Sequence, residues 1–153
     1  KSPMACILAL DVGTKTIGIA RAQTDARIPT PHATLRRRGV RQDVARLHTI
    51  VSELNAVEVV VGMPYELDGT EGRSARLARQ VGDALASVSG VPVHYQDERY
   101  STVVAEERLR SAGHNALRRK QTIDQAAAAV ILGDFFACAA RSEVAGDPEP
   151  KIR

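Results

Sequence analysis

The chain is built around residues 7–20, which read ILALDVGTKTIGIA. Two apolar runs are joined here by a short polar segment, a pattern typical of a β-hairpin. Gly13 lies in the connection, where a tight turn favours a residue that tolerates a positive φ. Asp11 closes the first run, so the pattern predicts a carboxylate where a buried strand meets solvent. A carboxylate beside Gly13 and Lys15 suits a metal ion or a phosphate, and it equally suits a cap for the turn.

The composition is that of one ordinary globular domain. The chain has 153 residues, of which 44% are hydrophobic and 25% are charged, enough for a sizeable core. We expect the domain to span residues 5–141, with flexible termini at 1–4 and 142–153. The apolar runs are too short or too broken to cross a bilayer, and the N-terminal residues lack the apolar core of a signal peptide. We therefore expect a cytoplasmic protein that has no contact with a membrane.

The charge balance favours an acidic partner. The net charge is +3 and the isoelectric point is about 9.1, and most of the basic residues are arginine, the better bidentate ligand for phosphate. Aromatic residues make up only 3% of the chain, which disfavours a single-strand binder that depends on base stacking. Cys6 and Cys138 lie in apolar surroundings without C-x-x-C spacing, which predicts free thiols rather than a zinc site or a disulfide.

Hydrophobic periodicity predicts the rest of the fold. It indicates strands at 6–11, 17–22, 32–35, 57–61 and 91–96, and helices at 40–54, 71–88, 101–111 and 122–140. Thr122 is interpreted as the N-cap of the last helix, and residues 113–121 as a polar, basic loop. The order β-β-β-α-β-α-β-α-α predicts an α/β protein in which helices cover a mixed sheet.

Acidic residues fall at the ends of three predicted elements. Asp11 ends the first strand, Asp97 and Glu98 end the last strand, and Asp124 opens the last helix. In open α/β sheets the crevice lies at the carboxyl ends of parallel strands, so these acids can meet there and hold Mg²⁺ or Mn²⁺ for phosphodiester hydrolysis. Alternation along a strand lets only one of Asp97 and Glu98 face such a metal. Structural roles explain the same residues: a helix N-terminal charge for Asp124 and an ion pair between Glu98 and Arg99.

Four blocks of sequence together resemble one known family. They are LDVGTKTIGIA at 10–20, GMP at 62–64 with DGTEG at 68–72, DERYST at 97–102, and KxxIDxAA at 120–127. In this order they are similar to the motifs of the YqgF/RuvX family, relatives of the RuvC Holliday junction resolvase, and the match covers residues 6–136. The resemblance implies an RNase H-like fold of the α/β class: a five-stranded mixed sheet, its first three strands antiparallel, with helices on both faces.

The resemblance also implies a site and its chemistry. Asp11, Glu98 and Asp124 are the expected catalytic residues and the expected ligands of one or two Mg²⁺ or Mn²⁺ ions, and Glu98 ranks above Asp97 on the family motif alone. The expected reaction is hydrolysis of phosphodiester bonds in structured nucleic acid, with 5′-end maturation of pre-16S rRNA as the first choice. Resolution of four-way DNA junctions is the alternative, and it requires a homodimer with two active sites.

Polar and basic residues around these blocks are expected to bind the nucleic-acid backbone. They are Thr14, Lys15, Arg73, Arg76, Arg99, Arg118, Arg119 and Lys120. Arg73 and Arg76 form, with Arg79, a stripe at helical spacing, and residues 118–120 come just before Asp124. A solvated charged face explains each cluster as well, and a turn-stabilising role explains Thr14 and Lys15.

Two other classes of protein share parts of the pattern. An actin-like or sugar-kinase-like ATPase also carries Asp-x-Gly-Thr in its phosphate loop, but it encloses its nucleotide between two such domains. A non-catalytic nucleic-acid-binding or ribosome-associated module would keep the fold and lack the cleavage. Nucleotide binding would identify the first class, and metal-dependent cleavage would exclude the second.

Overall fold

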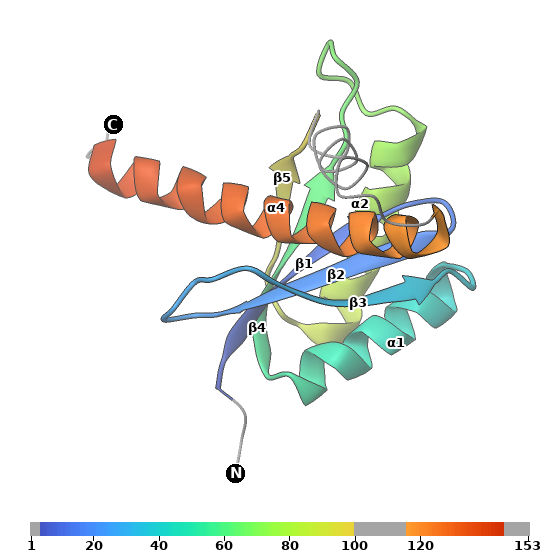
Figure 1. The fold of residues 1–153 in the computed structure, drawn as a ribbon, viewed down its shortest axis with the longest axis horizontal. Coiled ribbons are helices and arrows are strands. Elements are labelled where there is room, and N and C mark those ends of the chain that lie inside the picture. Colours follow the sequence, from blue (N-terminus) through green and yellow to red (C-terminus); the bar gives the residue numbers. More distant parts are fainter. Residues whose placement is uncertain (1–3, 100–115, 146–153) are drawn as a thin grey trace.

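The computed structural model describes residues 4–99 and 116–145 (Figure 1). In the second segment, side chains are described for residues 123–141. The strands are β1 (Cys6–Val12), β2 (Thr16–Gln23), β3 (Thr30–Arg36), β4 (Ala56–Met63) and β5 (Val93–Asp97). The helices are α1 (Val40–Glu53), α2 (Arg73–Ser89) and α4 (Ala116–Ala145). These elements match the predicted ones to within a few residues, except at the start of α4. The helix predicted at 101–111 lies outside the described residues.

Within the described residues, five strands form one mixed sheet in the order β3-β2-β1-β4-β5. β1 and β2 pair antiparallel, as do β2 and β3. β1 and β4 pair parallel, as do β4 and β5. The predicted α/β fold, with its first three strands antiparallel, is therefore confirmed. Because β1, β4 and β5 run in the same direction, their carboxyl ends meet at one edge of the sheet.

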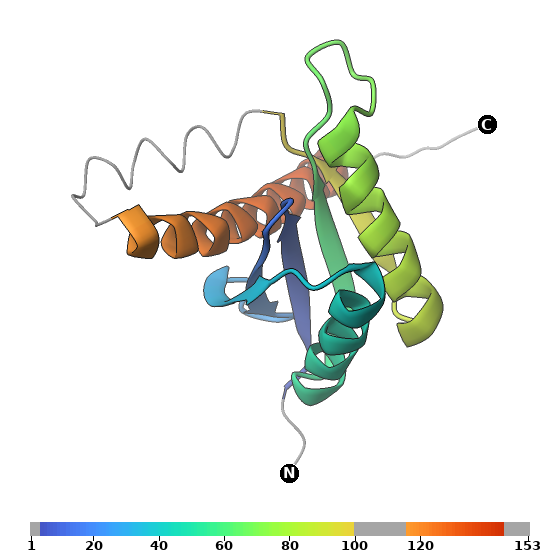
Figure 2. The ribbon, with the colours of Figure 1, turned by 90° about the vertical axis from the view of Figure 1, so that its right-hand side faces the viewer.

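Helices cover both faces of this sheet: α1 and α2 lie on one side and α4 lies on the other (Figure 2). Alternation along β1 sends successive side chains to opposite faces. The core under α1 and α2 includes Leu8, Leu10, Leu47 and Leu85, and the core under α4 includes Ile7, Ala9, Ile131 and Leu132. Asp11 follows Ile7 and Ala9 in this alternation, so it falls on the face that α4 covers.

The turn between β1 and β2 is stabilised by backbone hydrogen bonds. The N–H of Gly13 donates to the carbonyl of Thr16 at 2.8 Å, and the N–H of Arg37 donates to the carbonyl of Lys15 at 2.8 Å. The prediction of a positive φ at Gly13 is wrong, since its backbone is not in that region. Glycine is favoured here for space, because a Cβ at Gly13 would lie 3.2 Å from the Thr16 carbonyl oxygen.

The start of α4 is the main correction to the predicted elements. The helix begins at Ala116 and not at Thr122, because residues 116–121 (ALRRKQ) are all good helix formers and nothing interrupts them. Thr122 is therefore not an N-cap, and residues 118–120 lie in the helix rather than in a loop. Asp124 lies well inside α4, which excludes the helix N-terminal role considered for its charge.

The apolar character of α4 has an explanation in its packing. By length and composition alone, Ile123–Arg141 is apolar enough to cross a membrane, but the core helix of a soluble protein has the same composition. One side of α4 packs on the sheet through Ile131 and Leu132, with Phe135 and Phe136 beside them. The helix runs on to Ala145, past the predicted domain end at 141.

Candidate functional site

Asp11 and Asp124 line one cleft at the carboxyl end of β1. Asp11 lies opposite Gly18 in the β1–β2 hairpin, and Asp124 comes from α4 on the same face of the sheet. The cleft has a volume of about 430 Å³ and is also lined by Lys15, Thr16 and Ser74. We name it the Asp11 cleft. The structure thus brings together two of the three acids that the sequence predicted for the site.

Asp124 is held in place from two sides. The residue is 8% exposed, and its Oδ2 accepts a hydrogen bond of 2.5 Å from the Oγ1 of Thr16 on β2. Also on β2 is Gly18, where a Cβ would collide with the backbone carbonyl of Asp124. Small residues that follow in the helix, Ala127 and Ala128, are completely buried. As predicted, small side chains let α4 press against the sheet and bring the short aspartate within reach of the strands.

Glu98 lies at the same edge of the sheet, directly after the end of β5, the strand that pairs with β4. Its N–H donates to the carbonyl of Met63 at 3.0 Å, which continues the pairing of β5 with β4. His94 and Gln96 contact residues of α4, so alternation places Glu98 on the α4 face as well. The residue is 8% exposed, and both of its carboxylate oxygens are buried. A Cβ at Gly62 of β4 would collide with the Ile131 side chain of α4 and would lie in ordinary contact with the Glu98 Cγ, at 3.5 Å, so this glycine leaves room for Ile131 beside Glu98.

The three acids share a face and an edge of the sheet, but they are not one ready-made cluster. Glu98 is not part of the lining of the Asp11 cleft. Over the ranges that the structure describes, no group of three or more His, Cys, Asp or Glu side chains is placed to hold a metal ion. Coordination of one ion by Asp11, Glu98 and Asp124 together therefore stays a prediction.

Asp97 and Arg99 form a pair that points away from this site. Asp97 is exposed, and its carboxylate forms an ion pair with the Arg99 guanidinium at a distance of 3.1 Å. The Arg99 guanidinium also donates to the backbone carbonyl of Leu67 at 3.1 Å. The ion pair considered for Glu98 is thus made by Asp97 instead. Arg99, which the sequence assigned to nucleic-acid binding, is anchored to the loop that follows β4.

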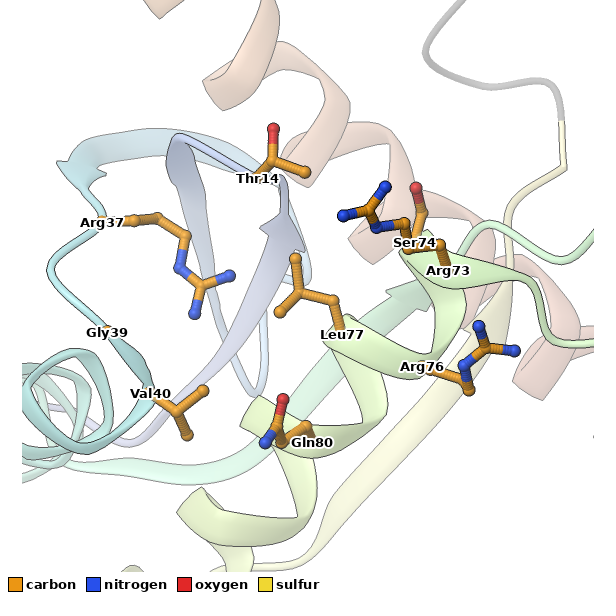
Figure 3. Close-up of a pocket in the computed structure, with 9 residues that line it drawn as sticks. All are labelled: Thr14, Arg37, Gly39, Val40, Arg73, Ser74, Arg76, Leu77 and Gln80. Atoms are coloured by element: carbon orange, nitrogen blue, oxygen red, sulfur yellow. The ribbon is translucent and has the colours of Figure 1, made fainter.

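A second pocket, drawn in Figure 3, adjoins the Asp11 cleft. It has a volume of about 570 Å³, and it shares Thr14 and Ser74 with the cleft. We name it the Arg73 pocket. Its other lining residues are Arg37, Gly39, Val40, Arg73, Arg76, Leu77 and Gln80. Three of the predicted backbone-binding residues, Thr14, Arg73 and Arg76, are therefore part of one lining, although the Arg76 side chain points away from the others. The side chains of residues 118–120 lie outside the described part of α4.

Asp43 is a structural acid that sequence reasoning missed. It is completely buried, and its carboxylate accepts hydrogen bonds from Arg37 at 2.8 Å, from Arg46 at 2.7 Å and from the N–H of Arg38 at 2.9 Å. Burial alone raises the pKa of Asp43, but these three donors outweigh it and hold the pKa below its ordinary value. Arg37 also donates to the carbonyl of Gly13 at 3.1 Å, so this cluster supports the turn that carries Thr14 and Lys15.

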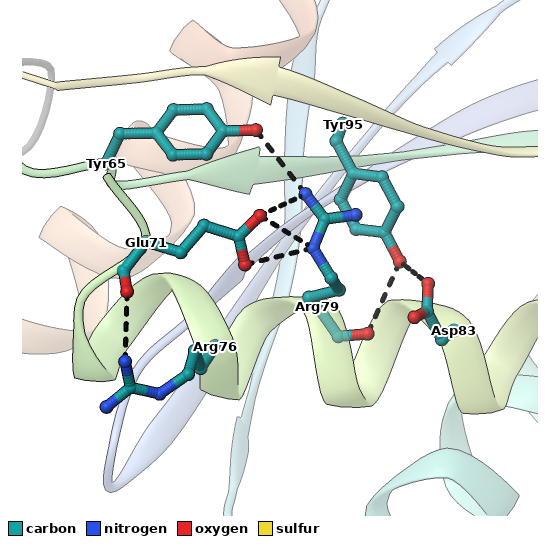
Figure 4. A network of polar contacts seen from close by, with 6 residues as sticks. All are labelled: Tyr65, Glu71, Arg76, Arg79, Asp83 and Tyr95. Carbon is teal, nitrogen blue, oxygen red and sulfur yellow. Dashed lines mark hydrogen bonds and ion pairs between the residues drawn. The ribbon is translucent and has the colours of Figure 1, made fainter. Parts of the chain in front are cut away.

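The predicted arginine stripe on α2 is only partly available to a ligand. Arg79 forms a bidentate ion pair with Glu71, with a shortest distance of 2.6 Å, and its guanidinium lies over the ring of Tyr95 (Figure 4). Tyr95 in turn donates a hydrogen bond to Asp83. Burial is the larger cause and this hydrogen bond the second, and both raise the pKa of Tyr95. Arg79 thus holds the loop at 64–72 against α2, whereas Arg73 and Arg76 form no ion pair with a carboxylate among the residues that the structure describes.

Comparison with known proteins identifies a family and relatives that this chain resembles in sequence. The family model described as "RuvX: Holliday junction resolvase" matches residues 5–138. A Cereibacter sphaeroides protein named "Putative pre-16S rRNA nuclease" is 43% identical over 126 residues, which are 82% of this chain and 79% of that protein. Its namesake in Mycobacterium tuberculosis H37Rv is 45% identical over 130 residues, with coverage of 84% and 76%.

A solved structure shows the same fold. RuvC of T. thermophilus in complex with a Holliday junction substrate superposes with a TM-score of 0.52 and 18% sequence identity, over 88% of this chain and 96% of that chain. At this identity the likeness concerns the fold alone, and it confirms the RNase H-like architecture. The family model spans most of the chain, and the relatives share well over a third of their aligned residues with it. The chain therefore belongs to the RuvX (YqgF) family.

Proposed function

We propose that this protein is a metal-dependent nuclease that cleaves structured RNA in the 5′-end maturation of pre-16S rRNA, in the cytoplasm. The observation that carries the proposal is the meeting of Asp11 and Asp124 in one cleft, with Lys15 in its lining. The names of the relatives support RNA as the substrate. Asp11, Asp124 and Glu98 are the proposed catalytic residues.

The chemistry of these side chains fits Mg²⁺ or Mn²⁺. Both ions prefer oxygen ligands, and carboxylates from separate elements are the usual protein donors. Asp11 and Asp124 share the cleft, and Glu98 is buried on the same face of the sheet. These three residues would hold one or two ions. A bound ion would supply an activated water and would stabilise the negative charge that develops on the phosphate.

The protein's own residues bind and orient the substrate. Lys15 and Thr14, at the tip of the turn, bind the phosphate that is cleaved, and Arg73 and Arg76 bind neighbouring phosphates. Thr16 fixes the side chain of Asp124 through its hydrogen bond to Oδ2. Water attacks phosphorus in line with the bond to the 3′ oxygen. That bond breaks, which leaves a 3′-hydroxyl on one product and a 5′-phosphate on the other.

Cleavage by the Asp11→Asn variant tests this function directly. The substrates are a precursor-like 16S rRNA 5′ segment, a generic single-stranded RNA and a four-way DNA junction, each with Mg²⁺, Mn²⁺ or EDTA. We expect metal-dependent cleavage of the precursor RNA by the wild type and none by Asp11→Asn, with RNA binding retained. Asp25→Asn, an exposed aspartate in the β2–β3 turn, is the matched control and should cleave normally. Full activity of metal-replete Asp11→Asn protein would refute the site.

Junction resolution is the second candidate function. The description of the family model and the fold shared with RuvC favour it. A resolvase needs two active sites related by a twofold axis, so this function also proposes a homodimer. Preferential cleavage of the four-way junction, together with a dimer mass in solution, would favour it over RNA processing. Nucleotide binding without cleavage would point to an actin-like ATPase, and RNA binding without cleavage to a non-catalytic module.

A further inference from the structure

The Arg73 pocket is placed where a nucleic-acid strand would leave the Asp11 cleft. Thr14 and Ser74 line both spaces, so a strand that crosses these two residues passes from one into the other. The pocket volume of about 570 Å³ lies in the range of small-ligand sites, about 300–1,000 Å³. A single nucleotide fits in such a volume.

The positive charge of this pocket is not cancelled by carboxylates. Arg37 is neutralised by Asp43, but Arg73 has no hydrogen-bond or ion-pair partner among the residues that the structure describes. Arg76 donates only to the backbone carbonyl of Glu71, at 3.0 Å. No aspartate or glutamate is found among the described lining residues. The N-terminal turn of α2 also favours an anion, because it holds no acidic residue and Gly72 provides no side-chain cap for its backbone N–H groups.

The inner wall of the pocket is apolar. Figure 3 shows Leu77 of α2 and Arg37 pointing toward one another, with Val40 and Gln80 below them and the Arg73 guanidinium near Thr14. Leu77 and Val40 are both partly buried, so they present a fixed apolar surface to a flat ring. The Gln80 amide carries both a donor and an acceptor for the edge of such a ring. Arg76 points away, along the outer side of α2.

We propose that the Arg73 pocket binds one unpaired nucleotide of the substrate, next to the phosphate that is cleaved in the Asp11 cleft. Arg73 binds the backbone phosphate, and the base lies against Leu77 and Val40. The inference rests on the proposed nuclease function and adds a requirement to it: the nucleotide beside the cleavage point is single-stranded. A complementary strand that pairs with this nucleotide keeps its base out of the pocket. The contact of the base with Leu77 and Val40 then no longer contributes to binding.

Filling the pocket tests the proposal. The probes are a short fluorescent single-stranded RNA and the same RNA annealed to its complement, both titrated with inactive Asp11→Asn protein. Adding Leu77→Trp fills the space, and we expect it to weaken binding of the single strand about tenfold, the size of one base contact, and to leave duplex binding unchanged. Val88→Trp, at an exposed apolar position of the same helix, is the control. No loss, or an equal loss for both probes, overturns the proposal.

A charge variant covers the case in which Leu77→Trp does not fold. Arg73 is exposed, so Arg73→Glu leaves the core intact. It should weaken single-strand binding more than Arg21→Glu, which makes the same change in net charge on exposed Arg21, in the lining of a different pocket. Equal weakening by the two variants overturns the assignment of the phosphate to Arg73.

Substrates that lack one base identify the position and separate this proposal from the nuclease function. An abasic site is moved stepwise along a cleavable RNA, and one position beside the cleaved bond should slow cleavage by the wild type but not by Leu77→Trp. Asp11-dependent cleavage that is indifferent to every abasic position and to Leu77 keeps the nuclease and overturns the pocket. Selective loss of single-strand binding in Leu77→Trp, with no cleavage under any metal, supports the pocket and overturns the nuclease.

Discussion

The Oγ1 of Thr16 donates a hydrogen bond of 2.5 Å to the Oδ2 of Asp124, and this bond joins the β1–β2 hairpin to α4. The two residues lie in the lining of the Asp11 cleft. The hydroxyl supplies a hydrogen-bond donor to one oxygen of the nearly buried Asp124 carboxylate, and this bond restricts rotation of the carboxylate. Thr16 therefore acts as a positioning residue for Asp124.

Removal of this hydroxyl should reduce cleavage more than binding. A hydrogen bond to a charged group contributes about 1.5–3 kcal/mol, so Thr16→Val should lower kcat about 10- to 100-fold while KM changes little. Thr16→Ser keeps the donor and should restore most of the rate. Rate measurements on the three proteins decide the role. A Thr16→Val protein that cleaves as fast as the wild type would show that the hydroxyl does not position Asp124.

Gly18→Ala should destabilise the protein by forcing α4 away from β2. The new Cβ would collide with the backbone carbonyl of Asp124, and overpacking of this kind costs about 1–3 kcal/mol. Gly133→Ala in α4 is the control, since its Cβ would lie 3.8 Å from Pro29. In a helix that change stabilises by about 0.5–1 kcal/mol. Urea denaturation should move the two midpoints in opposite directions, and a shared direction would contradict the packing described for Gly18.

Asp43→Asn should reduce stability at neutral pH and should matter less in acid. Asp43 and Arg37 are buried together, and breaking a buried pair costs about 3–5 kcal/mol. The folded-state pKa of Asp43 lies below its ordinary value of 3.8, so its contribution is fully present above that value. It is lost as the pH falls through the folded pKa. The difference in urea midpoint between wild type and variant should therefore be constant above pH 3.8 and should narrow below it, and a difference that does not narrow at lower pH would contradict the charged state.

The sequence predicts the sheet well because its signals are local. Asp11 could be assigned to a strand end from the alternation in residues 7–20, and the pairing of β1 with β2 follows from the short turn. The connections through α1 and α2 are long enough for crossovers between parallel strands, but their length does not determine that β4 pairs with β1. The start of α4 was missed because Thr122 resembles an N-cap, while residues 116–121 continue the helix without any change of hydrophobic pattern.

The electrostatic partners could not be predicted in the same way. Arg79 shares helical spacing with Arg73 and Arg76, but its partner Glu71 lies in the loop before α2, where helical spacing carries no information. Asp43 lies among arginines, and a solvated charged surface and a buried ion cluster have the same sequence pattern there. The only available signal was an acid in the first turn of α1 close to Arg37. Which arginines remain for a ligand depends on these tertiary contacts.

Lys15 separates a phosphate-binding role of the turn from a purely structural one. Lys15 is exposed in the turn between Asp11 and Thr16. If it contacts a substrate phosphate, Lys15→Ala should reduce the slope of log affinity against log salt by about 0.7 for single-stranded RNA, the value for one contact. The titrations use Asp11→Asn protein, and Arg21→Ala serves as the control with the same loss of charge. An unchanged slope together with a lower urea midpoint would assign Lys15 to the turn alone, because a structural lysine releases no counterions from the RNA.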